Sequence, residues 1–233
     1  MTTLIGTIAR DTWNTVSPVR CGGCGRPDVV CCPTCTRALA PQVHRPTLAI
    51  RRALFDVPVV AGLPYQGVAQ RVLTQFKERG VVGLGRYLAK PLRAAAHALG
   101  SEVSLAGVSV VCVPHSRAGW VKRGRHPTRD VVRWAGWSDA LAPLTTLRTP
   151  SIRAALTTSS SQKTRSRRDR LETPPTFVGG ADLHGQRILL VDDVLTTGIS
   201  LEYAARAVAQ RGGVVVGGVV IAATPPRNQK LSM

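Results

Sequence analysis

The fold of this chain is decided by residues 188–200, which have the sequence Ile-Leu-Leu-Val-Asp-Asp-Val-Leu-Thr-Thr-Gly-Ile-Ser. Residues 187–191, which are apolar from Ile188 onward, predict a strand, and a helix is expected from Ser200 to Gln210. Two acids, two threonines and a glycine lie between them. Because ligands of open α/β sheets bind beyond the carboxyl ends of the strands, this strand, turn and helix predict a ligand site.

The residue types of the turn suit a sugar phosphate. Asp192 and Asp193 can accept hydrogen bonds from ribose hydroxyls. A phosphate would receive backbone N–H groups and hydroxyls at the positive end of the helix, and Gly198 places no Cβ in the way. The predicted phosphate ligands are Thr196, Thr197, Gly198 and Ser200.

The turn has two other interpretations. An Asp-Asp pair after a strand is also common as a plain turn and helix cap. A Walker B strand of a nucleotide triphosphatase would need a G-x-x-x-x-G-K-[ST] loop upstream, which the sequence lacks.

Other segments extend the pattern of strands and helices. A helix is expected from Tyr65, on an i, i+3, i+4, i+7 pattern of apolar residues, with Gly80 just past its end, and a second helix over about 84–99. A strand over 108–113, stopped by Pro114, a helix over 128–142 and a strand over 214–221 complete the series. This alternation predicts an α/β fold with a doubly wound parallel sheet.

The N-terminal region carries two C-x-x-C pairs, and four thiolates close a tetrahedral site with no open position. The predicted ligands of a structural zinc ion are Cys21, Cys24, Cys32 and Cys35. An iron–sulfur cluster is the less favoured alternative, because the longer ferredoxin spacings are absent. Cys31 and His44 are possible competitors for the ion, and Cys112 is expected in the core.

Composition limits the class of protein. A chain of 233 residues can hold one α/β domain and a small appendage. With no apolar run long enough for a bilayer and no secretory signal pattern, a cytoplasmic protein is expected. The net charge of +18 favours an anionic partner, although a basic surface that only aids solubility is equally compatible with it.

Residues 188–200 resemble, position for position, the phosphoribosyl pyrophosphate signature of type I phosphoribosyltransferases. A broader resemblance is to the ComF family, competence-associated proteins that join a zinc module to this domain. It rests on the helix ending in Phe76-Lys77, on Val113-Pro114-His115-Ser116, on Arg123-Gly124 and on residues 162–170. The chain departs from the typical pattern at Arg125-His126, where Phe-Asn is usual, and at Thr173, where Asn is usual.

The resemblance implies a type I phosphoribosyltransferase fold. It also implies a reaction in which a nucleophile displaces pyrophosphate from C1 of the ribose, with Mg²⁺ on the leaving group. Catalysis would then depend on positioning and charge neutralisation. The implied pyrophosphate loop is Pro114, His115, Ser116 and Arg117, and a catalytic basic loop would hold Lys163, Arg165, Arg168 and Arg170. Lys77 and Arg123 are further possible site residues, and a solvated surface is the alternative for each basic residue.

The expected organisation is a zinc module at 1–45, a phosphoribosyltransferase domain at 46–223 and a disordered tail at 224–233. A hood that selects the acceptor would fall at 46–64. Two functions remain open. One is phosphoribosyl transfer to an unknown acceptor. The other is a non-catalytic factor of DNA uptake or recombination, which would bind single-stranded DNA or protein partners and use the fold to sense the ligand.

Overall fold

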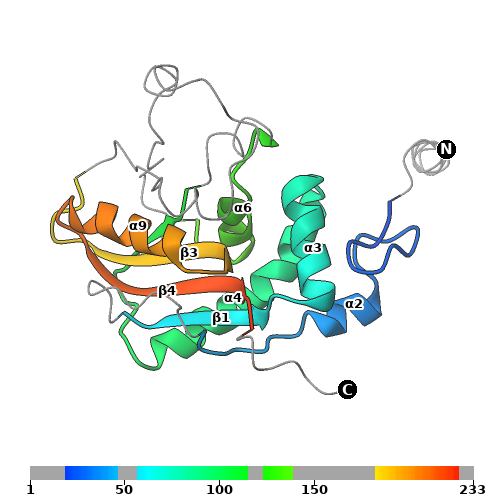
Figure 1. Cartoon of the computed structure of the whole chain (residues 1–233), viewed down its shortest axis with the longest axis horizontal. Helices are drawn as coiled ribbons and strands as arrows, with labels where there is room; N and C mark the ends of the chain where they lie inside the picture. The colour runs from blue at the N-terminus through cyan, green and yellow to red at the C-terminus, as the bar shows by residue number, and fades with distance from the viewer. Residues whose placement is uncertain (1–18, 47–56, 115–122, 139–181, 226–233) are drawn as a thin grey trace, which may run out of the picture.

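The computed structural model describes residues 19–46, 57–114, 123–138 and 182–225. Within them, strands β1 (Val59–Pro64), β2 (Ser109–Cys112), β3 (Arg187–Leu195) and β4 (Val214–Ala223) form one sheet. The strand order is β1-β4-β3-β2, and every neighbouring pair is parallel (Figure 1). The carboxyl ends of all these strands therefore meet at one edge.

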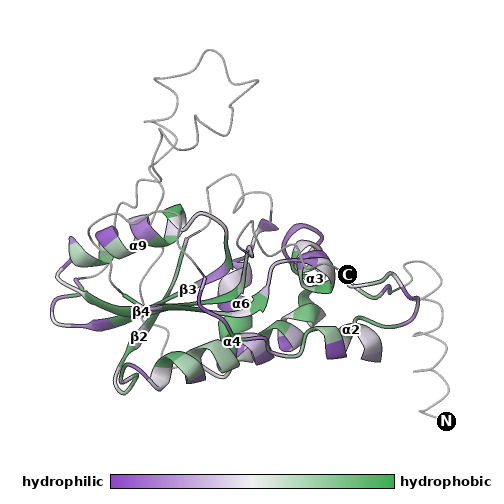
Figure 2. Cartoon of the chain, turned by 60° about the horizontal axis from the view of Figure 1, so that its bottom comes forward, coloured by the Kyte–Doolittle hydropathy of each residue, from purple (hydrophilic) through white to green (hydrophobic). Residues whose placement is uncertain are grey.

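Helices cover both faces of the sheet (Figure 2). On one face, Leu189 and Val191 of β3 belong to a core shared with α3 (Gly67–Glu78), α4 (Gly85–Gly100) and α6 (Pro127–Trp134). On the other face, Ile188 and Leu190 pack with α9 (Ile199–Ala209). Because both faces are covered, the strands are apolar almost without interruption. The predicted doubly wound α/β fold is confirmed.

Strand β3 is longer than expected. The sequence placed its end at Val191, but Asp192, Val194 and Leu195 continue the ladder and pair with Val220, Ala222 and Ala223 of β4. The acidic pair therefore lies inside the last part of the strand and not in a turn. Neighbouring β4 supplies backbone partners over this length, and such pairing overrides the low strand propensity of Asp.

Strand β1 corrects the assignment of residues 46–64 to a hood. Residues 59–64 form an edge strand hydrogen-bonded to β4, and Val60, Ala61 and Leu63 are almost fully buried. A short apolar run after Pro58 was the signal for a strand in the sequence. Residues 47–56 lie outside the described residues.

The helices differ from expectation mainly at their ends. α3 begins at Gly67 because the backbone of Gln66 is extended, with φ −153° and ψ 168°. Before it, the N–H of Tyr65 is donated to the carbonyl of Ala223 at the sheet edge. α6 ends at Trp134 and not at Ala142, and the chain turns at Gly136, where φ is 81°. At its start, His126 caps the helix and Pro127 occupies the first turn, a position where a missing N–H costs nothing.

The cysteine-rich segment packs directly on the sheet domain. Cys21, Cys32, Cys35 and Leu39 belong to the same core cluster as Leu84. His44 forms an antiparallel bridge with Ala61 of β1. A short helix that the sequence did not predict, α2 (Pro33–Ala38), lies beside α3 (Figure 1). The segment is thus held by the same core as the sheet domain.

Among the described residues, no helix has both the length and the apolar character needed to cross a bilayer.

Candidate functional site

The turn between β3 and α9, residues 196–200, is named the anion cradle because its geometry suits an anion. Gly198 is the N-cap of α9 and has φ 83°, in the left-handed region that favours glycine. Thr196 and Ser200 are exposed, and Thr197 and Gly198 are half-buried. The first N–H groups of a helix have no partner within the helix, so this accessible N-terminus can bind an anion.

The acidic pair lies immediately before the cradle, with Asp192 8% and Asp193 4% exposed. Successive strand residues point to opposite faces, so Asp193 shares the face of Leu189 and Val191, where α3 packs. The N–H of Asp193 donates to Oδ1 of Asp192 at 2.8 Å. Burial, followed by the charge of Asp193, raises the pKa of the Asp192 carboxyl well above its usual value. The structure thus places an acid with an elevated pKa next to the accessible N-terminus of α9.

Lys77, in the last turn of α3, supplies a cation to this pair. Its Nζ lies 2.8 Å from Oδ2 of Asp193, and the Asp193 side chain is 5% exposed. Charge attraction and a hydrogen bond both favour the charged ammonium in this contact. Burial alone would lower the pKa of Lys77, but the Asp193 carboxylate outweighs it and raises that pKa above its usual value.

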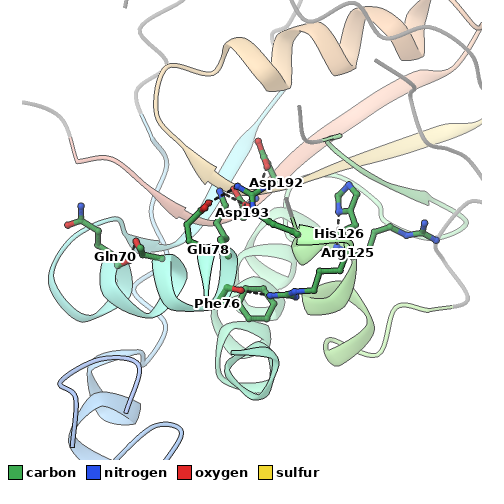
Figure 3. A network of polar contacts seen from close by, with 11 residues as sticks. Gln70, Phe76, Glu78, Arg125, His126, Asp192 and Asp193 are labelled. Atoms are coloured by element: carbon green, nitrogen blue, oxygen red, sulfur yellow. Dashed lines mark hydrogen bonds and ion pairs between the residues drawn. The ribbon is translucent and has the colours of Figure 1, made fainter. Parts of the chain in front are cut away.

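Two arginines just before α6 contact the last turn of α3. Arg123 forms an ion pair with Glu78 at 2.6 Å. Arg125 pairs with Asp130 at 2.5 Å and donates a hydrogen bond to the carbonyl of Phe76. Figure 3 shows this network running from the acids of β3 through the end of α3 to Arg125 and His126. The structure therefore brings the predicted residue Lys77 to the acidic pair and the predicted residue Arg123 to Glu78, next to Lys77 in α3.

The four predicted cysteines form a metal cluster. One possible ligand atom from each lies within 4.8 Å of all the others, and among the described residues no other group qualifies. Sγ of Cys24 and Sγ of Cys32 are 3.7 Å apart. This is far too long for a disulfide, but thiolates about 2.3 Å from a tetrahedral zinc ion would stand about 3.8 Å apart. The donor set therefore fits zinc.

Local contacts favour the thiolate form of Cys21, whereas burial raises the pKa of Cys35. Although burial raises the pKa of Cys21, backbone N–H groups led by that of Cys32 bring it down to about 6. The N–H of Cys32 lies 3.3 Å from Sγ of Cys21. A Cβ on Gly23 would lie 2.5 Å from Sγ of Cys35, so the first C-x-x-C loop leaves no room there for a side chain.

The other cysteines and His44 lie outside the cluster. Cys31 accepts a hydrogen bond from the Thr36 hydroxyl at 3.5 Å. The ring of His44 contacts the carbonyl of Gln42 at 3.0 Å. Cys112 is buried in β2, as expected, and this burial raises the pKa of its thiol to about 12. The spacing rule, which selected Cys32 over Cys31, therefore chose the correct residue.

Of the predicted pyrophosphate loop and basic loop, only Pro114 lies within the described residues. Pro114 follows β2 at the carboxyl edge and is half-buried. The other members of the predicted pyrophosphate loop and the entire basic loop lie outside the described residues; they are His115, Ser116, Arg117, Lys163, Arg165, Arg168 and Arg170.

The sequence did not predict which residues contact Arg123 and Arg125. Arg123 pairs with Glu78, and Arg125 pairs with Asp130. Phe76 contacts Arg125 with both its carbonyl and its ring. The only hint in the sequence was the departure at Arg125 from the family pattern. Which residues these side chains meet depends on the packing of α3 against α6, and this packing cannot be inferred from spacing.

Comparison with known proteins adds an independent observation. No curated protein matches the chain. A family model described as the phosphoribosyl transferase domain matches residues 140–232, which include β3, α9, β4 and the anion cradle. The chain thus has an α/β fold with a parallel sheet and an N-terminal four-cysteine cluster, and its residues 140–232 are similar to the phosphoribosyl transferase domain.

Proposed function

We propose that this protein binds phosphoribosyl pyrophosphate with Mg²⁺ and transfers the phosphoribosyl group to a nucleophilic acceptor. The observation that carries the proposal is the left-handed Gly198 at an accessible helix N-terminus, directly after the buried pair Asp192-Asp193, within the matched region. The 5′-phosphate would bind the N–H groups of residues 196–200, and the acids would accept the ribose hydroxyls.

The remaining roles follow the same chemistry. Mg²⁺ neutralises the pyrophosphate leaving group. Pro114, His115, Ser116 and Arg117 are proposed to bind this pyrophosphate, and Lys163, Arg165, Arg168 and Arg170 to offset its charge as it departs. The four-cysteine cluster would hold a structural zinc ion, since four thiolates leave no position for a substrate. We also propose that the protein is ComF-like and cytoplasmic, with domains at residues 1–45 and 46–223.

A thermal unfolding experiment tests binding. Mg²⁺-phosphoribosyl pyrophosphate at about 100 times its Kd should stabilise the protein by roughly 2.7 kcal/mol, and pyrophosphate or ribose 5-phosphate alone should do less. Asp193→Asn and Gly198→Val should abolish the shift. A wild-type protein that shows no shift at saturating ligand would refute the binding site.

A second experiment tests transfer. Release of pyrophosphate is measured with a panel of purine bases, pyrimidine bases and amines. Release that depends on one class of acceptor and is lost in Gly198→Val would support catalysis. Binding without release for any acceptor would favour the ligand-sensing alternative.

One observation favours that alternative. A groove of about 760 Å³ lies between α3 and the first C-x-x-C loop. Among the described residues, its lining includes Arg20, Arg71 and Arg79 but no acidic residue. Such a surface suits the phosphates of single-stranded DNA, or an acidic protein partner of DNA uptake or recombination. Binding of single-stranded DNA with a steep salt dependence, weakened by Arg79→Ala, would support this function.

A further inference from the structure

Arg125 makes contacts with two helices at once. Its Nη1 pairs with Oδ2 of Asp130 in α6 at 2.5 Å, and its Nη2 donates to the carbonyl oxygen of Phe76 in α3. The guanidinium carbon also lies 4.5 Å from the centroid of the Phe76 ring. The side chains of Arg125 and Asp130 are only 18% and 20% exposed. One guanidinium group therefore joins the last turn of α3 to the first turn of α6.

The residues on both sides of Lys77 are held in this way. Arg125 holds Phe76, and Arg123 holds Glu78 at 2.6 Å. Gly124 stands between the two arginines with φ 61°, so the loop turns sharply there. Lys77 lies between Phe76 and Glu78 in the chain, and its ammonium lies 2.8 Å from Oδ2 of Asp193.

The last turn of a helix needs such support. Its final carbonyls have no partner within the helix, and helix ends fray. At the end of α3, Arg125 satisfies the carbonyl of Phe76, while the N–H groups of Arg79 and Val81 are donated to Gln75. These contacts, together with the buried ring of Phe76, fix the backbone that carries Lys77 relative to β3.

We propose that Arg125 is a positioning residue that holds the end of α3 so that Lys77 reaches Asp193 at the proposed ligand site. The proposal rests on the proposed function only in taking the acidic pair as part of that site. The planar fork of arginine suits the role because it can stack on the Phe76 ring while it donates to Phe76 and Asp130. A lysine ammonium has no such fork.

The test follows the titration of the aspartate carboxyls by ¹³C NMR in the full chain without phosphoribosyl pyrophosphate. Lys77→Met should raise the apparent pKa of Asp192 by about 1 unit, because the nearby cation favours the ionised acid. Arg125→Met should reproduce at least half of that shift. Adding Arg125→Met to Lys77→Met should produce little further change, because the arginine acts through the lysine.

Two variants separate positioning from charge. The side chain of Arg133 is 59% exposed, and its Nη1 lies 3.8 Å from Oδ1 of Asp130. Arg133→Met removes this cation and should leave the titration of Asp192 unchanged. Arg125→Lys keeps the charge and should behave like Arg125→Met. Wild-type titration in Arg125→Lys, or shifts of Arg125→Met and Lys77→Met that add up, would overturn the proposal.

Substitute variants and the absence of ligand keep the titration test decisive. If Arg125→Met does not fold, Arg125→Lys and the uncharged change Phe76→Leu give the same comparison. Because no phosphoribosyl pyrophosphate is present in this titration, a negative result would contradict the role of Arg125 but not the proposed ligand binding. A protein that fails to bind the ligand can likewise still show the expected titration.

Discussion

The ammonium of Lys77 lies 2.8 Å from a carboxylate oxygen of Asp193, and this contact joins the end of helix α3 to the carboxyl end of strand β3. Asp193 is nearly buried and Lys77 is partly exposed. The pair places a cation directly beside the proposed ribose site. Its removal should therefore affect both stability and ligand binding.

Lys77→Met should destabilise the protein by about 2 kcal/mol, since a buried carboxylate loses its cation. The measurement is urea unfolding at neutral pH. Lys90→Met is the matched control, because Lys90 is exposed on α4, and it should change stability by less than about 0.5 kcal/mol. Equal effects of the two substitutions would show that the ion pair contributes nothing.

Asp192→Asn should remove a pH dependence of stability. The folded-state pKa of Asp192 is raised, so between about pH 4, where an unfolded carboxyl titrates, and that raised pKa the folded protein binds the additional proton. The contribution of Asp192 to stability is therefore greatest below pH 4 and is lost as the pH rises through the folded pKa.

Urea unfolding from pH 4 to pH 8 measures this contribution. The wild type should lose stability relative to Asp192→Asn over the range, and the asparagine variant should be the more stable at neutral pH without ligand. Asp182→Asn, at an exposed carboxylate, should run parallel to the wild type. A wild type parallel to Asp192→Asn would contradict the raised pKa.

Gly198→Ala should lower stability by roughly 1–2 kcal/mol, because alanine is strained at φ 83°, and should also weaken binding of phosphoribosyl pyrophosphate. Gly185→Ala is the matched control. Gly185 has φ 71° and open space around it, and it lies at the opposite end of β3. Thermal unfolding with and without ligand should show a similar strain cost in both variants but a reduced ligand shift only in Gly198→Ala.

Removal of the metal should destabilise the whole chain, because the cysteines share a core with Leu84. Metal analysis should find one zinc per chain in the wild type and in Cys31→Ser, and none in Cys35→Ser. A structural zinc site that contributes at least about 3 kcal/mol implies a Tm lower by roughly 10 °C in Cys35→Ser. Full zinc content in that variant would exclude the assigned ligand set.

Much of the fold and part of the site follow from local sequence patterns. Two C-x-x-C pairs select four ligands whatever the rest of the chain does, because thiolates and spacing suffice for a tetrahedral ion. The run of apolar residues before Asp192 and the Thr-Thr-Gly after it determine a buried strand that leads into a helix N-terminus. These features depend on residues close together along the chain.

Only the tertiary structure decided which distant side chains meet. It paired Lys77 with Asp193 and Arg125 with Phe76, made residues 59–64 an edge strand, and extended β3 through the acids by pairing them with β4. The physical reason is that such contacts depend on how helices pack on the sheet and on which strands are neighbours. A local pattern of residues does not contain that information.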